Sequence, residues 1–440
     1  MYDFTLKPNS LDEYWMPFTP QRHWKKAPRM LVKAKGMFYY DDTGREILDG
    51  AGGLWCVNAG HGVERIKQAV IEQMNTLDFA PSFRYGHPTV FRAASRAVSM
   101  MPKNISNVFF SNSGSEAVDT ALKIALAYHR TRGESSRRLL IGRERAYHGV
   151  GFGGISVGGI PYNRKAFGQL LPNIDHLPAT YDFERNGISR GQPEYGADFA
   201  DELENLIAMH DASNVAAVIV EPVSCSTGVL PPPKGYLERL RAITEKHGIL
   251  LIFDEVVTGF GRLGCASAAE YLGIEPDMIT SAKALTNGAM PMAATFTSKK
   301  VFDGMMSGPE EAIELYHGYT YSGHPVAAAA MLATMDEYQE EKIFENARNM
   351  MPKWEAALHS LADKPYVKDI RNWGILGGIE LHPGKNGEDL GTKMFNDMWD
   401  YGLTLRPGAS GCVAFSPPLI LNENHIDRIV STVSDYLQTL

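Results

Sequence analysis

Cysteine is scarce in this 440-residue chain: Cys56, Cys225, Cys265 and Cys412 lie far apart and form no C-x-x-C pair. We therefore expect no zinc knuckle, no disulfide framework and no metal site. Positive charge is not in excess either, because 43 Lys and Arg stand against 51 Asp and Glu, which gives a net charge of −8. This balance gives no electrostatic help to a nucleic-acid or anionic-membrane partner.

Long apolar segments and internal repeats are absent from the sequence as well. No apolar run approaches the roughly 18 residues that cross a bilayer. Residues 1–8 lack the charged and apolar regions of a signal peptide. Hydrophobic residues make up 44% of the chain and charged residues 21%, which is typical of a globular protein and excludes a disordered one. We expect a soluble, cytoplasmic protein of enzyme size.

Short apolar runs alternate with helical patterns through the middle of the chain. Such alternation favours an α/β fold with a mainly parallel sheet. We expect a large domain at about 71–330 and a small α+β domain formed by both chain ends, 1–70 and 331–440. A hairpin is expected at 37–44, and Pro352 is expected to break or start a helix. The predicted strands are 108–110, 139–141, 215–220, 249–253, 278–280 and 293–296, and the predicted helices include 235–247, 326–338 and 426–437.

Three groups of residues follow predicted strands, at the edge where an open parallel sheet binds ligands. Ser113-Gly114-Ser115 opens a helix, where N–H groups, hydroxyls and the helix dipole can hold a phosphate, although an ordinary serine N-cap has the same sequence. Asp254 is either a catalytic carboxylate or a helix cap. Lys283 stands among apolar residues, where desolvation makes an amine nucleophilic unless the side chain is exposed.

Taken together, a phosphate cup, a strand-end carboxylate and a lysine nucleophile are the parts of a pyridoxal phosphate site. The lysine holds the cofactor aldehyde as a Schiff base. The carboxylate keeps the pyridine nitrogen protonated, so that the ring can accept carbanion electrons. The ion pair between this carboxylate and the protonated ring nitrogen, at about 3 Å and an effective dielectric constant of about 20, has a Coulomb attraction of about 5 kcal/mol. The cost of desolvating the two charges offsets a part of this attraction. We therefore predict pyridoxal 5′-phosphate as the cofactor.

The segments around these residues resemble the class III pyridoxal-phosphate-dependent aminotransferases. The run LIFDEVVTGFGR at 251–262 is similar to the family signature, and SAKA at 281–284 places Lys283 29 residues after Asp254. SNSGSEA at 111–117 and HGYTYSGHP at 317–325 are similar to the phosphate loop and to a later loop. The resemblance extends from about residue 15 to the C-terminus. WMPFT at 15–19, APRM at 27–30 and GLW at 53–55 resemble the group that acts on ω-amino acids and pyruvate.

The resemblance implies the type I fold of pyridoxal-phosphate-dependent transferases and a two-step transamination. An ω-amino acid such as β-alanine, or a primary amine, would give its amino group to pyruvate, leaving an aldehyde or ketone. The implied assembly is a homodimer or a dimer of dimers with sites at the subunit interface. Lys283 would bind the cofactor and move the proton, and Asp254 would pair with the pyridine nitrogen.

The remaining roles are also implied by the resemblance alone. Ser113, Gly114 and Ser115 would bind the phosphate, together with Thr320 from the neighbouring subunit. Tyr147 and Val256 would contact the two faces of the ring, and Glu221 would lie nearby as a supporting residue. Arg406 would bind the substrate carboxylate, and the pocket walls would be Trp55, Phe18 and, from the neighbouring chain, Phe83. The sequence gives no role to His148.

Other interpretations are weaker or remain open. The run GVGFGG at 149–154 matches G-x-G-x-x-G, but we expect no helix to open there, which argues against a nicotinamide-dependent oxidoreductase. Arginines at 132–145 form a basic stretch that acidic residues interrupt, so a solvated face is favoured over a nucleic-acid-binding module. A decarboxylating transaminase or an aminomutase would share Lys283 and Asp254. The segment 49–53 is richer in small residues than we expect for this group and is expected beside the pocket wall, and the segment 225–227 is another candidate lining of the pocket. Both leave open which substrates the pocket accepts.

Overall fold

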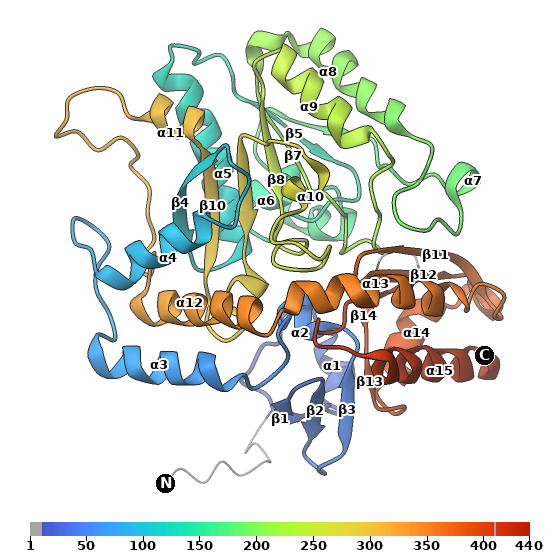
Figure 1. Cartoon of the computed structure of the whole chain (residues 1–440). Helices are drawn as coiled ribbons and strands as arrows, with labels where there is room; N and C mark the ends of the chain where they lie inside the picture. The colour runs from blue at the N-terminus through green and yellow to red at the C-terminus, as the bar shows by residue number, and fades with distance from the viewer. Residues whose placement is uncertain (1–10, 409–410) are drawn as a thin grey trace.

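The computed structural model describes residues 11–408 and 411–440. Within them, a seven-stranded sheet with the order β4-β10-β9-β8-β7-β5-β6 forms the centre of the larger half of the molecule (Figure 1). All neighbouring pairs are parallel except those of β10, which is antiparallel to both β4 and β9. The strands are β4 (Ile105–Ser111), β10 (Ala293–Ser298), β9 (Met278–Ser281), β8 (Leu250–Asp254), β7 (Val215–Val220), β5 (Leu139–Arg143) and β6 (Ile174–Leu177). The prediction of a mainly parallel α/β sheet is confirmed.

Helices cover both faces of this sheet, which explains why its strands are apolar at nearly every position. Leu250 and Ile252 of β8 pack in one cluster with α5, whereas Leu251 and Phe253 pack in another with α8 and α9. Successive side chains of a strand point to opposite faces, so both faces of β8 are core. Each such buried side chain contributes about 1.5–3 kcal/mol. The helices of this half are α4 (Pro88–Val98), α5 (Gly114–Thr131), α6 (Phe152–Val157), α7 (Phe183–Asn186), α8 (Glu202–His210), α9 (Tyr236–Lys246), α10 (Ala268–Leu272) and α11 (Lys299–Met305).

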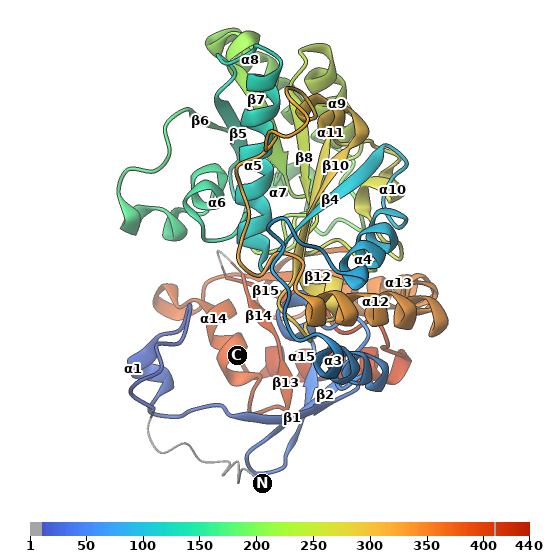
Figure 2. The ribbon, with the colours of Figure 1, turned by 90° about the vertical axis from the view of Figure 1, so that its left-hand side faces the viewer.

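Two four-stranded sheets form the other half, and segments from both ends of the chain meet there (Figure 2). Strand β3 pairs in parallel with β13, although more than 350 residues separate them. The predicted hairpin is confirmed, because β2 and β3 are antiparallel neighbours. One sheet is β1 (Leu31–Lys35), β2 (Phe38–Asp41), β3 (Glu46–Asp49) and β13 (Leu403–Thr404); the other is β11 (Val367–Trp373), β12 (Leu376–Leu381), β15 (Cys412–Phe415) and β14 (Arg406–Pro407).

Long helices lie between the two halves and beside the small sheets. In Figure 1, α12 and α13 cross the middle of the molecule, below the central sheet. Ile66 of α3 packs against Ala330 and Ala333 of α12. The domain boundary predicted at residue 330 lies inside α12, and the division into domains stays a prediction. The helices here are α1 (Gln21–Trp24), α2 (Gly52–Trp55), α3 (Glu64–Thr76), α12 (Pro325–Glu340), α13 (Ile343–His359), α14 (Leu390–Asp397) and α15 (Glu423–Thr439).

Two local predictions are wrong. Pro352 neither breaks nor starts a helix but lies inside α13. Its ring is exposed, and the buried Trp354 and Leu358 on the same helix supply packing that offsets the roughly 3 kcal/mol cost of an internal proline. A short helix, α6, does open within the glycine-rich run, after Gly151. The glycines there allow close packing, since a Cβ on Gly154 would lie 2.2 Å from the His148 carbonyl oxygen.

The opening of α6 does not restore the nicotinamide-binding fingerprint. That motif needs a strand directly before its first glycine, whereas β5 ends at Arg143, six residues before Gly149. None of the helices in 11–408 and 411–440 is long and apolar enough to cross a membrane.

Candidate functional site

The predicted phosphate cup lies where β4 ends and α5 begins. Ser113 is the N-cap of α5, and its hydroxyl accepts a hydrogen bond from the Glu116 N–H at 3.3 Å. The Ser115 hydroxyl accepts one from the Val150 N–H at 3.0 Å. A Cβ on Gly114 would lie 3.0 Å from Val256 Cγ1, so any larger residue here would press against that side chain. The first N–H groups of α5 and the dipole of this 18-residue helix make an anion-binding position.

Asp254 ends β8 and is buried. Its Oδ1 atom accepts hydrogen bonds from the Val256 N–H and from the Thr280 hydroxyl, both at 3.1 Å. Its Oδ2 atom lies 2.7 Å from His148 Nδ1. Asp254 and Thr280 are register partners on the parallel strands β8 and β9, which brings the two side chains together. The carboxylate is therefore held by groups from three separate segments.

Lys283 begins a short 3₁₀ helix (Lys283–Thr286) just after β9 and has a positive φ of 51°. Its Nζ atom lies 5.3 Å from the centre of the Trp55 ring. Burial lowers the pKa of this amine, and the nearby Cys56 and Asp254 side chains offset part of the effect. Among the described residues, its ammonium has neither a hydrogen bond nor an ion pair, which is costly for a lysine and suits an amine that reacts as the neutral base.

The three segments meet at one edge of the sheet. Val256 lies two residues after Asp254. It packs with Ala117 of α5 and with Ala282, which directly precedes Lys283. A Cβ on Gly114 would lie 3.7 Å from the Ala282 Cβ. The tertiary structure thus brings the predicted cup, carboxylate and lysine together.

Tyr147 and Glu221 lie on two loops that are hydrogen-bonded to each other. The Tyr147 N–H donates to Glu221 Oε1 at 2.9 Å, and the Cys225 N–H donates to Oε2 at 3.3 Å. Glu221 is buried, and desolvation raises the pKa of its carboxyl. Its side chain holds the loop of Tyr147 against the loop of Cys225.

Trp55 and Arg406 form one wall of the site. The guanidinium carbon of Arg406 lies 5.1 Å from the centre of the Trp55 ring. Lys283 Nζ lies 5.3 Å from the centre of the same ring. Trp55 is buried and Arg406 is half-buried. Neither Arg406 Nε nor Trp55 Nε1 has a hydrogen-bond partner among the described residues. A guanidinium without a partner in the described part of the chain has donors available for a carboxylate.

A single chain does not enclose the remaining predicted residues. Phe18 is 77% exposed, Phe83 is 59% exposed, and Thr320 is exposed. Phe83 packs beside the loop that carries Thr320, because a Cβ on Gly318 would lie 2.8 Å from the Phe83 ring. In this single chain, the three side chains are thus largely exposed rather than packed into the site.

Sequence reasoning missed several residues of the site. His148 and Thr280 contact Asp254, and no spacing or periodicity pointed to either. Asp49 is a further case: its carboxylate accepts hydrogen bonds from the Ala51 N–H at 3.0 Å and the Gly53 N–H at 2.8 Å. The small residues at 49–53 are thus explained, since they form a tight turn around this carboxylate just before Trp55.

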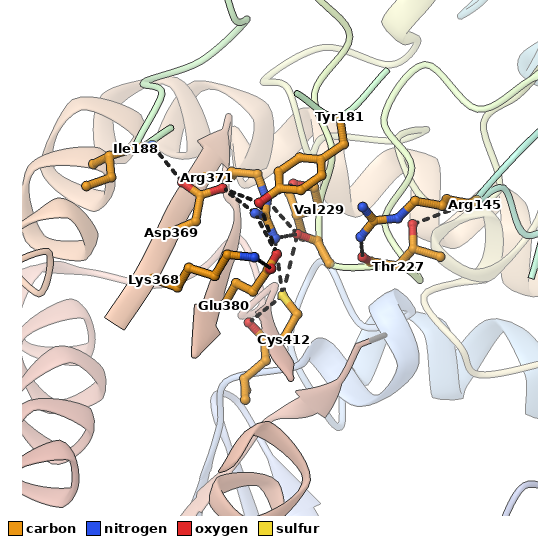
Figure 3. A network of polar contacts seen from close by, with 12 residues as sticks. Arg145, Tyr181, Ile188, Thr227, Val229, Lys368, Asp369, Arg371, Glu380 and Cys412 are labelled. Atoms are coloured by element: carbon orange, nitrogen blue, oxygen red, sulfur yellow. Dashed lines mark hydrogen bonds and ion pairs between the residues drawn. The ribbon is translucent and has the colours of Figure 1, made fainter. Parts of the chain in front are cut away.

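A second network fastens the site loops to the sheet that carries Arg406 (Figure 3). Arg371 of β11 is ion-paired to Asp369 and Glu380, and it also donates to the Gly228 carbonyl at 3.1 Å. Its guanidinium and that of Arg145 each lie 4.8 Å from the centre of the Tyr181 ring.

Arg145 extends this network toward the site. Its carbonyl accepts a hydrogen bond from the Thr227 hydroxyl at 2.8 Å. Tyr147 lies two residues after Arg145, so the loop of Tyr147 is tied to the loop at 225–229 and to β11.

The donor set fits pyridoxal phosphate. The N–H cradle at Gly114 suits a phosphate, the oriented carboxylate of Asp254 suits a protonated pyridine nitrogen, and the unpaired amine of Lys283 suits an aldehyde. Fold and site together define a pyridoxal-phosphate-dependent transferase of the type I fold. Residues 20–437 match the class-III aminotransferase family, and the chain belongs to that family, whose members use pyridoxal phosphate.

Relatives of similar length support this assignment. The chain is 56% identical to an omega-aminotransferase of Caulobacter vibrioides over 426 residues, covering 97% of each chain. It is 44% identical to a beta-alanine–pyruvate aminotransferase of Pseudomonas aeruginosa, covering 97% of this chain and 96% of the relative. An amine transaminase from an uncultivated Pseudomonas species, solved in its PLP-bound form, superposes with a TM-score of 0.90 at 32% identity and covers 98% of this chain and 100% of its own.

Proposed function

We propose that this aminotransferase moves the amino group of an ω-amino acid such as β-alanine, or of a primary amine, to pyruvate. The products are alanine and an aldehyde or ketone. The observation that carries the proposal is the Arg406 guanidinium over Trp55, with Lys283 beside the same ring; Arg406 Nε has no hydrogen-bond partner among the described residues. This arrangement places a carboxylate-binding group on the wall of the pocket that contains the reactive amine. The substrates named for the Pseudomonas aeruginosa relative, β-alanine and pyruvate, support it, as does the omega-aminotransferase name of the Caulobacter relative.

The roles of the side chains follow from their positions. When bound, the cofactor supplies an electron sink that stabilises the substrate carbanion. We infer that Lys283 Nζ takes the proton from the substrate carbon and returns it, as a general base and acid whose pKa burial lowers toward the working pH. Asp254 would keep a positive charge on the pyridine nitrogen, and Val256 and Tyr147 would contact the two faces of the ring. Ser113, Gly114 and Ser115 would bind the phosphate, while Glu221 holds the loop of Tyr147.

Arg406 and Trp55 control which substrates react. Arg406 binds the carboxylate of pyruvate or of the amino acid through parallel N–H donors. Trp55 limits the pocket and keeps water away from Lys283. A decarboxylating transaminase or an aminomutase would use the same Lys283 and Asp254, and release of CO2 distinguishes the first of these from transamination.

We further propose that the protein is a homodimer or a dimer of dimers and works in the cytoplasm. Phe18, Phe83 and Thr320 are exposed in the single chain, and other large apolar side chains are exposed on the same segments, including Trp15 at 86% and Tyr316 at 84%. Exposed aromatic clusters of this kind mark association surfaces. In the assembly, Thr320 would reach the phosphate of the neighbouring subunit and Phe83 would wall its pocket.

The absorbance spectrum of the holoenzyme tests the proposal. β-Alanine is expected to bleach the band of the lysine-bound cofactor, and pyruvate is expected to restore it, because the two half-reactions alternate on one cofactor. Alanine and the aldehyde are then measured as products, together with CO2. A band that β-alanine leaves unchanged would reject the substrate class while leaving the cofactor assignment intact.

A further inference from the structure

Asp49 is the last residue of β3, and the function proposed above gives it no role. The parallel pairing of β3 with β13 makes Asp49 and Thr404 register partners. Along the chain, Trp55 follows Asp49 by six residues, and Arg406 follows Thr404 by two. The paired strands therefore lead to the two side chains that form one wall of the site.

The carboxylate of Asp49 is fully buried and has four hydrogen-bond donors. Its Oδ1 atom accepts from the Thr404 hydroxyl and from the Ala51 N–H, both at 3.0 Å. Its Oδ2 atom accepts from the Gly53 N–H at 2.8 Å and lies 2.8 Å from His61 Nε2. An ionised carboxylate only accepts hydrogen bonds, so Nε2 carries a proton and donates it. These donors fill the roughly four acceptor positions of a carboxylate, which holds it in one orientation.

Two of the donors belong to the turn that leads to Trp55, and this turn has an unusual backbone. Gly52, Gly53 and Trp55 have φ values of 54°, 65° and 60°. A bulky residue is rare at positive φ, and such a conformation persists only where its surroundings hold it. A Cβ on Gly52 would lie 2.7 Å from Nη2 of the buried Arg262, so the turn is also closely packed. The Asp49 carboxylate is thus one of the groups that hold Trp55 in place.

The third donor, the Thr404 hydroxyl, belongs to the strand that leads to Arg406. The backbone of Thr404 is bonded separately, because its carbonyl accepts a hydrogen bond from the Gly50 N–H at 3.1 Å. The hydroxyl adds a link from this strand to the carboxylate that holds the turn of Trp55. The two segments joined in this way carry the side chains that stack on each other in the wall of the site.

We propose that Asp49 and Thr404 are positioning residues for the wall of the substrate pocket. Together they fix Arg406 relative to Trp55, and they thereby set the preference for substrates that carry a carboxylate. An arginine binds both oxygens of a carboxylate through donors of fixed geometry, so a small shift of its strand misaligns them. The proposal rests on the proposed function, because it requires Arg406 to bind the substrate carboxylate.

Holoenzyme variants test the proposal. Thr404→Val removes the hydroxyl but keeps the shape of the side chain, and Thr404→Ser retains a hydroxyl. Asp49→Asn keeps the size of the side chain but replaces one acceptor with a donor. Thr244→Val is the matched control, because Thr244 is buried and its hydroxyl donates to the Arg241 carbonyl within α9. For each variant, kcat and KM are measured with pyruvate, together with single-turnover rates for β-alanine and for benzylamine, which has no carboxylate, and the melting temperature.

We expect Thr404→Val to lower kcat/KM for pyruvate about tenfold, mainly through KM, which matches the loss of one hydrogen bond to a charged group. The reaction of β-alanine should slow to a similar extent, whereas that of benzylamine should change little. Thr404→Ser should recover most of the wild-type rates, and Asp49→Asn should show a larger loss with the same selectivity. If Asp49→Asn does not fold, the Thr404 variants decide the matter. Thr244→Val should change the melting temperature alone.

A double-variant cycle then tests whether the effect passes through Arg406. In the Arg406→Ala background, Thr404→Val should cause no further loss with pyruvate, because the group that it positions is absent. Additive losses overturn the proposal, as do equal losses for pyruvate and benzylamine in Thr404→Val. If Arg406→Ala alone loses both substrate types equally, the proposed function fails and this proposal fails with it. If Arg406→Ala is selective and Thr404→Val is not, the positioning role alone is rejected.

Discussion

The guanidinium of Arg406 lies over the ring of Trp55, 5.1 Å from its centre. Cation–π contact at this distance stabilises the arginine without using its N–H donors. We expect Arg406→Ala to lower kcat/KM for pyruvate about 10–150-fold, because charge-assisted hydrogen bonds contribute about 1.5–3 kcal/mol. Amines that lack a carboxylate should lose far less. The exposed Arg92, changed in the same way, is the control. Equal losses for both substrate types would remove Arg406 from this role.

Trp55 is expected to set the upper size of the amine. Trp55→Gly should raise kcat/KM for bulky aromatic amines relative to β-alanine, because the buried ring no longer fills the pocket wall. It should also lower the melting temperature, since removal of a buried aromatic side chain costs about 3–5 kcal/mol. Trp24→Gly, a tryptophan in α1, is the matched control. An unchanged ratio of the two rates would show that another residue limits the pocket.

Lys283 should react with the cofactor at a lower pH than an ordinary lysine. A lowered pKa gives a larger neutral fraction at any given pH, so the rate of cofactor recombination with the apoenzyme should rise with pH and level off below the usual lysine value of 10.5. Lys283→Ala should still bind the cofactor but show no multiple turnover. Lys299→Ala, on an exposed lysine, should behave as the wild type. Sustained transamination by Lys283→Ala contradicts the assignment.

Sites that share residues between subunits can be tested by mixing variants. A chain with Lys283→Ala and a chain with Thr320→Asp should each be inactive as homodimers, the second because a carboxylate repels the phosphate. In a two-fold dimer, the mixed dimer then contains one site with both wild-type residues. We expect it to regain activity, measured after purification through two different tags. Thr76→Asp is the control for added charge. A mixed dimer without activity would mean that Thr320 serves its own chain.

The Arg371 network should matter for stability. Arg371→Met leaves Asp369 and Glu380 buried without their shared partner, which costs about 3–5 kcal/mol. The denaturant midpoint should fall accordingly. Removal of the exposed Arg428, paired with Glu46, should cost about 0–1 kcal/mol. If the two variants unfold at the same denaturant concentration, the buried network adds no more than a surface pair.

Much of the large sheet and its site could be predicted because the signals are local. An apolar run such as 215–220 is buried on both faces, so its strand was predicted with the bounds that the structure has. The helix opening at 114 and the acid that ends β8 were predicted for the same reason. The predictions at Pro352 and at the α6 glycines were wrong, because tertiary packing outweighs the local cost of proline and glycine in a helix.

The sequence by itself determined the alternation of strands and helices, the residues at the strand ends that we assign to the cofactor, and the resemblance to a family. These follow from patterns within short windows or from motifs in fixed order. Only the tertiary structure decided that His148 is hydrogen-bonded to Asp254 and that Arg406 lies over Trp55, because 106 and 351 residues of chain separate the members of these pairs. Their contact depends on how loops from different strands pack, and no local pattern records that packing.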